Sequence, residues 1–430
     1  MGEHGGIGAV IAGAALAARS TGPTSDVVHA ALRETGADVA GQCLTAFLLW
    51  VRDTCEEASV THVAFLARDG ELPLRMAQAM PADHWQGFDL QYLQGTRRLW
   101  SVAAAAVIGV PEWLDAGTAE ETSFIRYGQH DIPWSALLGR VSLGAGDLAG
   151  HPVLAALPPD RPLPVDLDDE WRSLLADPGA RDTISVRANE QYANVRQHLE
   201  GVGITSSRGA LVDVGWRGQL AWHISAVLRA VTGDEPMHLH FGGANTSPEA
   251  YLVDLRRFAV DDRVAPPPFF DIVSCVETFT ASGHARARAL ERDPGGNVRV
   301  VYAEASAEMD TAERRLLWKA AVAVAGNMPS RAEMRQWPPV DDHVAEGVRA
   351  VLSAFWLAPS PTHALAAANL AAEVDDVGVG IEVVASPYRL RGLGTASRTW
   401  RHGSLRLTPP WLRHPLRLLF ALRAAKNGSR

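Results

Sequence analysis

Cysteine is scarce in this sequence of 430 residues, and no apolar run is long enough to cross a bilayer. The three cysteines, Cys43, Cys55 and Cys275, are an odd number without metal-type spacing, which predicts buried thiols in a reducing compartment. The apolar stretch at residues 5–18 is shorter than the roughly 20 residues of a transmembrane helix, and no basic segment precedes it as in a secretory signal. We therefore expect a cytoplasmic protein.

Several catalytic and cofactor-binding signatures are missing as well. The sequence has no G-x-S-x-G nucleophile elbow, no P-loop for phosphate and no cysteine–histidine pattern for zinc. His238 and His240 alternate with apolar residues, but two histidines do not form a zinc site without a third ligand. Nothing outside a basic C-terminal tail favours nucleic-acid binding, so no nucleic-acid partner is expected.

The composition is that of an ordinary globular protein, with 47% hydrophobic and 21% charged residues. The net charge of −9 is unevenly placed. Residues 389–430 hold ten of the 40 lysines and arginines and no acidic residue, which leaves 30 basic against 49 acidic residues in the rest of the chain. This asymmetry predicts a tail that meets phosphate, an anionic membrane surface or the acidic body of the protein itself.

Two segments share the pattern of a buried strand, a tight turn and a helix. In the first, residues 63–70 (VAFLARDG) lead into helical spacing over residues 71–80. In the second, residues 210–218 (ALVDVGWRG) lead into a helix over residues 219–231. Ligands of open α/β sheets bind beyond the carboxyl ends of the strands, so we predict that both turns face one crevice.

The alternation of strands and helices predicts an α/β, Rossmann-like fold with a mostly parallel sheet and flanking helices. Further strands are expected at residues 89–93, 237–242 and 257–260. An inserted helical cap and a helical C-terminal region complete the expected architecture. The expected parts are a flexible leader at 1–24, an α/β core at 25–305 with an insertion at about 111–180, a helical region at 306–385, and a basic amphipathic tail at 386–430.

The second turn has the features of an anion site. Backbone N–H groups at a helix start, together with the helix dipole and Arg217, attract phosphate or carboxylate. Gln219 could add directional donors, Trp216 could stack on a sugar or base, and Asp213 could accept a proton or hold Mg²⁺. The alternative is an ordinary tight turn without a ligand, in which the Trp216 side chain packs in the core and Asp213 caps the N-terminus of the helix.

The first turn and two later positions add further charged candidates. Arg68 and Asp69 could serve a ligand, or could form a salt bridge that closes the turn. Arg97 and Arg98 could extend an anion cradle, or could lie on a solvated helix start. Glu277 lies among apolar residues, so it requires a partner or a raised pKa, which suits a base, a metal ligand or the buried partner of an arginine.

These candidates fall into two groups. The expected catalytic residues are Asp69, Asp213 and Glu277, and Asp213 is also the candidate metal ligand, with Mg²⁺ as the candidate cofactor. The expected substrate- or phosphate-binding residues are Arg68, Gly70, Arg97, Arg98, Gly215, Trp216, Arg217, Gly218 and Gln219.

The chain resembles a bacterial family at these positions. FLARDG at 65–70, Thr96-Arg-Arg98, LVDVGWRGQL at 211–220 and the helix with Glu277 occur in this order in predicted HAD-superfamily hydrolases, downstream of their HAD-like domain. The match covers roughly residues 38–300. Those proteins are frequent in surface-polysaccharide gene clusters and are sometimes fused to glycosyltransferases. A looser likeness is to phosphoribosyltransferases, which pair a short turn with an acidic, glycine-containing phosphate loop.

The leading hypothesis is an enzyme that acts on a phosphorylated or nucleotide-linked sugar, as a glycosyl or phosphosugar transferase in surface-glycan or secondary-metabolite biosynthesis. The alternatives are a non-catalytic sugar-phosphate-binding or scaffold protein and, third, a HAD-like phosphatase. Residues 398–426 combine basic and apolar side chains, which favours peripheral contact with an anionic membrane. Docking of this tail on the acidic body is the competing expectation.

Overall fold

The structure, a computed structural model, describes most of the chain. The described residues are 6–19, 26–120, 123–204, 209–243, 248–261, 270–283, 287–302, 310–373, 381–389 and 400–427, without the side chains of 249, 251, 270–274, 372–373, 381–382 and 421–427.

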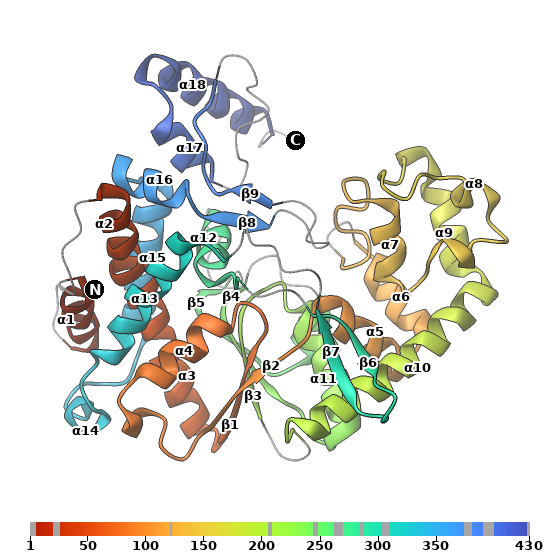
Figure 1. Ribbon diagram of the computed structural model, residues 1–430, viewed down its shortest axis with the longest axis horizontal. Coiled ribbons are helices and arrows are strands. Elements are labelled where there is room, and N and C mark those ends of the chain that lie inside the picture. The colour runs from red at the N-terminus through yellow and green to blue at the C-terminus, as the bar shows by residue number, and fades with distance from the viewer. Residues whose placement is uncertain are drawn as a thin grey trace.

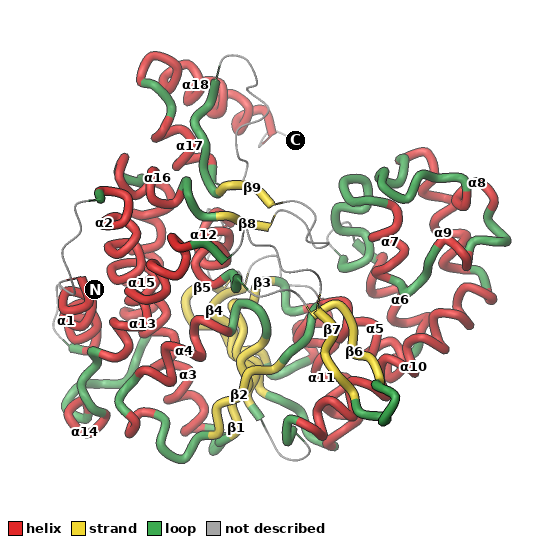
Figure 2. The backbone as a smooth tube through the Cα atoms, in the orientation of Figure 1, coloured by secondary structure: helices red, strands yellow, loops and turns green. Residues whose placement is uncertain are grey.

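A five-stranded parallel sheet lies at the centre of the molecule, with helices on both sides (Figures 1 and 2). Its strand order is β2-β1-β3-β4-β5, and every neighbouring pair is parallel. The strands are β1 (His62–Leu66), β2 (Asp89–Leu93), β3 (Ala210–Trp216), β4 (Met237–Gly243) and β5 (Leu255–Asp261). The predicted α/β, Rossmann-like fold class is confirmed.

The order of the strands defines where a ligand site is expected. The chain passes from β1 to β2 on one side and then returns to place β3 on the other side of β1. The connection from β1 to β2 and the connection from β3 to β4 therefore run in opposite directions along the sheet, and this opens a crevice between the carboxyl ends of β1 and β3. Both predicted turns follow the strands that border this switch point.

Alternating side chains of the strands bury both faces of the sheet. In β1, Val63 and Phe65 join the main hydrophobic cluster, whereas Ala64 and Leu66 belong to the cluster on the opposite face. The first face is covered mainly by α3 (Gln42–Glu57), α4 (Glu71–Ala79), α12 (Phe270–Thr280), α13 (Ala312–Gly326) and α15 (Asp342–Leu357). The second face is covered by α5 (Arg97–Ile108), α10 (Pro178–Gly201) and α11 (Gln219–Thr232).

The N-terminal segment corrects one expectation. Residues 7–19 were expected in a flexible leader, but they form α1 (Ile7–Arg19), whose residues Ile7, Ile11 and Ala15 are buried in the main cluster. The helix packs against α13. Its alanines and glycines are small enough for close helix packing, and this apolar segment buries one side although its sequence has no distinct polar side.

The cap is a separate lobe with its own hydrophobic cluster, at the right of Figure 1. It is joined to the body by α5, which leads into it, and α10, which leads back. Its helices are α6 (Val110–Thr118), α7 (Trp134–Arg140), α8 (Pro152–Ala155) and α9 (Asp168–Ala176), with 3₁₀ turns at Ala145–Asp147 and Val165–Leu167.

The remaining elements surround the sheet. Two antiparallel pairs lie outside the main sheet. The first is the hairpin of β6 (Ala287–Arg292) and β7 (Val298–Tyr302), and the second is the short pair of β8 (Ala371–Glu373) and β9 (Ile381–Val383), which interrupts the region at 306–385 that was expected to be helical. The other elements are α2 (Val27–Glu34), the π-helical turn Thr35–Gly41, the 3₁₀ turns Ala82–His84 and Pro248–Leu252, α14 (Arg331–Met334), α16 (Pro361–Ala367), α17 (Arg401–Leu407) and α18 (Pro410–Asn427). Among the described residues, no helix has the length and apolar character needed to cross a membrane.

Candidate functional site at the switch point of the sheet

The first turn is a compact connection between β1 and α4. The N–H of Gly70 donates to the carbonyl of Leu66 at 2.8 Å, and a Cβ atom at Gly70 would lie 2.5 Å from that same carbonyl oxygen. Only glycine therefore fits the turn without a backbone shift. The turn also contacts α12, because the hydroxyl of Thr280 donates to Oδ1 of Asp69 at 3.3 Å.

The second turn has an unusual backbone. Gly215, Trp216 and Gly218 all have positive φ values, of 102°, 110° and 75°. For a tryptophan this conformation is unfavourable, and such residues cluster at functional sites. A side chain at Gly215 would collide with the carbonyl of Gly242, and a Cβ atom at Gly218 would lie 2.5 Å from Cβ of Ala250. Packing within the fold therefore accounts for both glycines of this turn, which were predicted to bind phosphate.

The structure brings the three predicted catalytic carboxylates together. Asp69 lies close enough to raise the pKa of both Asp213 and Glu277, and Arg97 lies close enough to lower both. These residues come from the turn after β1, from β3, from α12 and from the start of α5. Four segments that are distant in sequence thus meet at the switch point.

Asp213 is partly buried, and its pKa is raised to about 7. Burial is the largest cause, and the negative charge of Asp69 adds to it, whereas Arg97 and the backbone N–H groups of Val214 and Gly215 oppose the rise. The Val214 N–H donates to Oδ1 of Asp213 at 2.8 Å. Asp213 is thus not the N-cap of α11, a position that Gly218 occupies without a capping side chain.

Glu277 has its pKa raised to about 8. The largest cause of this rise is the loss of water around the carboxyl group, followed by the negative charge of Asp69 and, more weakly, that of Asp213. Arg97 and the indole N–H of Trp216 act in the opposite direction, because they favour the ionised form. Solvent nevertheless reaches the Glu277 side chain, which is exposed at the surface of α12, and this hydration tempers the rise. A carboxyl group that is accessible and titrates near neutral pH suits general acid–base chemistry.

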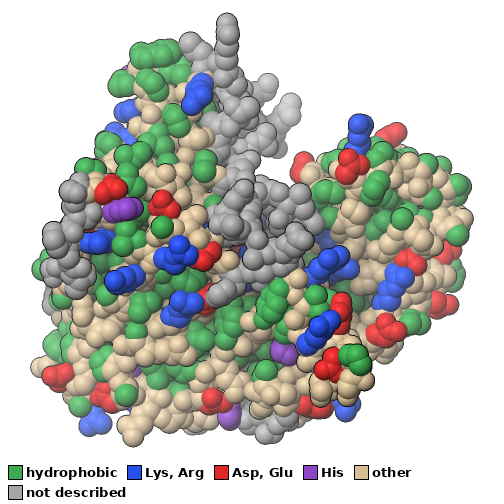
Figure 3. Space-filling view, viewed as in Figure 1, with side chains coloured by type: hydrophobic (Ala, Val, Ile, Leu, Met, Phe, Trp, Pro, Cys, Tyr) green, Lys and Arg blue, Asp and Glu red, His purple; other side chains and the backbone are tan. Residues whose placement is uncertain are grey.

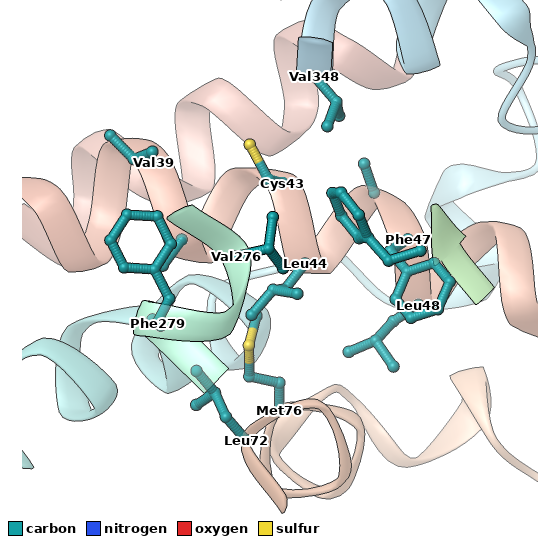
Figure 4. Packing of buried hydrophobic residues seen from close by; sticks show 14 of the residues in the cluster. Val39, Cys43, Leu44, Phe47, Leu48, Leu72, Met76, Val276, Phe279 and Val348 are labelled. Atoms are coloured by element: carbon teal, nitrogen blue, oxygen red, sulfur yellow. The ribbon is translucent and has the colours of Figure 1, made fainter. Parts of the chain in front are cut away.

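The position of Glu277 is fixed by the helix that carries it. Figure 4 shows Val276 and Phe279 of α12 packed among side chains of α3 and α4, such as Leu44 and Met76. Val276 and Phe279 are each 2% exposed. Because they anchor α12 in the main core, Glu277 is held on the opposite, accessible side of the helix.

The two adjacent arginines of α5 take different directions. Arg97 acts on the carboxylates Asp213 and Glu277, as described above. Arg98 instead lies near the cap, where a Cβ atom at Gly139 would lie 3.2 Å from Nη1 of Arg98. Burial and, to a smaller extent, the charge of Arg288 lower the pKa of Arg98. Successive helical residues point about 100° apart, so only Arg97 joins the carboxylates, and the expected role of Arg98 beside them is not supported.

Trp216 is a core residue, which corrects its expected stacking role. The side chain is 7% exposed and belongs to the main hydrophobic cluster, and a Cβ atom at Gly242 would lie 2.7 Å from its Cζ3. The ring faces are therefore covered by protein. The indole Nε1 is buried without a hydrogen bond of normal geometry, although it lies near enough to Glu277 to stabilise the carboxylate.

Arg217 and Gln219 lie at the start of α11, beside the cap. The guanidinium carbon of Arg217 is 4.4 Å from the ring centroid of Tyr127, a cation–π contact between the turn and the cap. Close by, the ring of Phe124 meets His223 of α11 edge-on at 4.7 Å between centroids. Gln219 is the first residue of α11 and is partly exposed. The cap therefore contacts the core directly at the predicted anion site.

Three residues of this region were missed by the sequence interpretation. Glu71, 6% exposed, accepts hydrogen bonds from Arg75 at 2.5 Å and from the hydroxyl of Ser282. Tyr92 is the last residue but one of β2, and burial together with the charges of Glu71 and Asp69 raises its pKa. Glu71 directly follows the Arg-Asp-Gly turn and could have been found from that position.

Arg314 is the third of these residues and is 3% exposed. Its Nη1 donates to the carbonyls of Thr278 and Ala281, at 3.1 and 2.5 Å, and its Nη2 donates to the carbonyl of Ala371. Burial, followed by the charge of Arg68, lowers its pKa to about 10. Arg314 thus holds the end of α12 beside the site, and no sequence motif marks it.

A metal role for Asp213 has limited support from the chain. Within the described ranges, no three or more histidine, cysteine, aspartate or glutamate side chains are arranged to hold a metal ion. Mg²⁺ bound to a phosphorylated substrate needs only one or two carboxylates from the protein. The role of Asp213 as a magnesium ligand therefore stays a prediction that depends on a bound phosphate.

Comparisons with known proteins give no independent assignment. No family model matches the sequence, and no curated protein sequence matches it. The resemblance to HAD-associated proteins therefore stays an expectation, and the functional argument depends on the geometry of the site.

Proposed function

We propose that the protein is an enzyme that acts on a phosphorylated or nucleotide-linked sugar and transfers a glycosyl or phosphosugar unit. The observation that carries this proposal is the group formed by Asp213, Glu277, Asp69 and Arg97 at the switch point. Carboxyl groups with pKa values near 7 and 8 can both give and take protons at neutral pH.

The proposed reaction uses the carboxylates as acid and base. The charge of Asp213 helps to raise the pKa of Glu277, and Asp69 raises the pKa of both, so near neutral pH each of the two groups can be found with or without its proton. One carboxylate would take the proton of an attacking hydroxyl group, and the other carboxyl group would protonate the leaving oxygen. Sugars supply hydroxyl groups for this chemistry and for hydrogen bonds to Asp69.

The anionic part of the substrate would be held at the start of α11 and by Arg97 and Arg68. The first N–H groups of α11 have no capping side chain, and the helix has 14 residues. Arg68 is partly buried beside Asp69, and burial lowers its pKa while Asp69 raises it. Positive charge next to paired carboxylates suits a substrate that combines phosphate with hydroxyl groups.

The test separates binding from turnover. Nucleotide sugars and sugar phosphates are screened by thermal shift with and without Mg²⁺, because a ligand of the native state raises the melting temperature. Ligands that bind are then assayed for turnover with the wild type, Asp213→Asn, Glu277→Gln and the control Glu346→Gln, an exposed residue of α15. We expect the first two variants to bind the ligand and to lose about 100-fold or more in turnover, and the control to keep full activity.

Full turnover in both carboxylate variants would contradict the proposal. Binding without any turnover in the wild type would favour a sugar-phosphate-binding protein instead. Phosphate release from a general aryl phosphate would favour the phosphatase alternative.

We also propose that α18 contacts an anionic membrane at the interface. Its residues Leu412 and Leu416 are buried against α17, in a cluster with Leu405 and Tyr388. Its opposite side presents large apolar side chains, because Trp411 and Leu418 are 64% and 68% exposed. Figure 3 shows hydrophobic and basic side chains gathered on the part of the surface formed by α17 and α18 (labelled in Figure 1).

The arginines of this region support a membrane rather than the acidic body as the contact. Among the residues that the structure describes, Arg401, Arg406, Arg413 and Arg417 form no ion pair with a carboxylate. Arg413 instead donates to the carbonyls of Arg406 and Thr408, both at 2.9 Å. Basic groups beside exposed tryptophan and leucine favour the headgroup region of an anionic bilayer.

A further inference from the structure

The cap contains a pocket that the proposed reaction does not use. It has a volume of about 240 Å³ and lies between α6, the loop at residues 123–132, α9 and the first turns of α10. This is below the range of about 300–1,000 Å³ that is typical of drug-sized ligands. A molecule in this pocket would therefore be no larger than a sugar phosphate.

The lining of the pocket is mixed polar and apolar and includes three arginines from three different segments. Arg126 comes from the loop, Arg172 from α9 and Arg181 from α10, and they face two carboxylates, Asp115 and Asp168. The lining thus carries a surplus of one positive charge. Guanidinium groups offer several N–H donors in a plane, which suits phosphate and carboxylate groups.

These arginines keep donors for a ligand. Arg181 uses its Nε to donate to the carbonyl of Leu175 at 2.9 Å, which fixes the side chain and leaves its terminal nitrogens. Arg172 contacts Asp169 at 3.3 Å, but both side chains are largely exposed, so this pair is weak and readily exchanged. The pocket is therefore able to neutralise an anion without the loss of a buried ion pair.

The walls of the pocket also carry groups that match hydroxyls. Asp168 accepts a hydrogen bond from Nε2 of Gln129 at 3.1 Å and lies 3.4 Å from His130, which orients the carboxylate. Gln129 and Trp171 are 5% and 2% exposed, yet Oε1 of Gln129 and Nε1 of Trp171 have no hydrogen-bond partner in the described part of the chain. Buried polar atoms of proteins are normally satisfied, so such a wall retains unused hydrogen-bonding capacity.

The loop that lines the pocket also contacts the candidate active site. Arg126 and Gln129 of this loop face the pocket, whereas its Tyr127 stacks on Arg217 of the β3–α11 turn. Arg140 holds the loop by donating to the carbonyls of Ile125 and Tyr127 at 3.1 and 2.5 Å. A ligand in the pocket would therefore act on a segment that is shared with the predicted anion site.

We propose that the cap pocket is a second binding site, for a small metabolite that carries a phosphate or carboxylate group next to hydroxyl groups. Its anion binds Arg126, Arg172 and Arg181, and its hydroxyl groups donate to Asp115 and Asp168. Through Tyr127 and Arg217, occupancy of this pocket influences the site at the switch point. This proposal does not require that the switch-point site be a transferase.

The experiment uses three related probes and the full chain. Glucose 6-phosphate, glucuronate and glucose are compared by thermal shift and calorimetry, which distinguishes phosphate, carboxylate and neutral ligands. The pocket variants are Arg126→Gln, Arg172→Gln and Arg181→Gln. The side chain of Arg172 is 66% exposed, so its substitution should leave the fold intact. The matched control is Arg196→Gln, an exposed arginine of α10 outside the pocket. Asp213→Asn removes the candidate active-site carboxylate.

We expect one of the anionic probes to bind the wild type, Arg196→Gln and Asp213→Asn, and to bind the pocket variants about tenfold or more weakly. Hydrogen exchange should slow in residues 114–132 and 168–181 on binding. Two results would overturn the proposal: equal binding of glucose and of both anions, or binding that Asp213→Asn abolishes and the pocket variants retain. Failure of all three probes to protect the cap would overturn it as well, whereas failure of the proposed function alone would leave cap protection intact.

Discussion

Asp213 and Glu277 retain their protons at a higher pH than ordinary carboxyl groups because the protein around them removes water and Asp69 adds negative charge. This arrangement disfavours ionisation in the folded state and therefore opposes folding at neutral pH. Proteins accept such a cost at sites where a group has a chemical task. The raised pKa values are thus the residue-scale property that most favours a catalytic interpretation.

Asp213→Asn is expected to change the pH dependence of stability. The pKa of Asp213 is raised from 3.8 to about 7 on folding, so the unfolded chain loses this proton first as the pH rises. The wild type therefore loses free energy of unfolding between about pH 4 and pH 7, and the asparagine variant does not. Because the side chain is partly exposed, we expect the variant to gain about 2 kcal/mol relative to wild type between pH 5 and pH 8.

Urea unfolding at several pH values checks this expectation. Glu346→Gln on the exposed face of α15 is the control and should follow the wild type at each pH. A constant difference between Asp213→Asn and the wild type across this range would show that Asp213 does not titrate there.

At the scale of elements, α18 is the feature with an apolar side that no described element covers. Its amphipathic character was evident from the sequence, but the side that it buries was not. The structure assigns Leu412 and Leu416 to the contact with α17, so Trp411, Leu418 and Leu419 remain outside it. The membrane contact can therefore be tested by a substitution on the exposed side of α18 that leaves its contact with α17 unchanged.

We expect Leu418→Ser to weaken cosedimentation with anionic phosphatidylglycerol vesicles. Burial of a leucine side chain is worth about 2 kcal/mol, so pelleting should fall severalfold, and high salt should weaken it further. Leu252→Ser is a matched control, because Leu252 is 69% exposed and Leu418 is 68% exposed. Equal pelleting of both variants, or equal binding to neutral phosphatidylcholine vesicles, would exclude the proposed contact.

The elements differ in how far the sequence predicts them. β1 and β3 were evident because continuous apolar residues end abruptly in charged, glycine-containing turns. α1 was misassigned because almost all of its residues are small or apolar, so its sequence shows no polar side that would mark the opposite side as buried. β8 and β9 have three residues each, too few for a periodic pattern.

The site was predicted in part for similar physical reasons. A turn at the end of a buried strand indicates which residues are near a ligand, and this found Asp69 and Asp213. Whether Arg97 or Arg98 joins them depends on the rotation of α5, which packing sets. Trp216 and Arg314 could not be assigned, because a core tryptophan and a buried arginine that binds carbonyls have no local signature in the sequence.

At the scale of the whole molecule, one hydrophobic cluster connects segments from both ends of the chain. It includes α1, the strands of the sheet, and α12, α13 and α15. The three cysteines all lie in this cluster, and none forms a disulfide. The predicted buried thiols are confirmed, and burial raises the pKa of each, that of Cys55 to about 12.

We expect a thiol reagent to label the three cysteines together and only as fast as the core opens. Buried, protonated thiols do not react, so labelling reports unfolding of the cluster as one unit. Ser173→Cys, at an exposed position of α9, is the control and should react at once in the folded protein. If Cys275 alone reacts early, α12 opens independently of the core and the support of Glu277 is weaker than proposed.

The packing of α1 against α13 has a consequence for biosynthesis. The N-terminal helix leaves the ribosome long before residues 312–326, which cover it, have been translated. The part of its surface that packs against α13 must therefore stay uncovered or be shielded by chaperones for most of translation, although its contacts with Thr35–Gly41 and α3 can form earlier. Nascent chains halted before residue 312 should bind such chaperones, and chains that extend past residue 326 should be released from them.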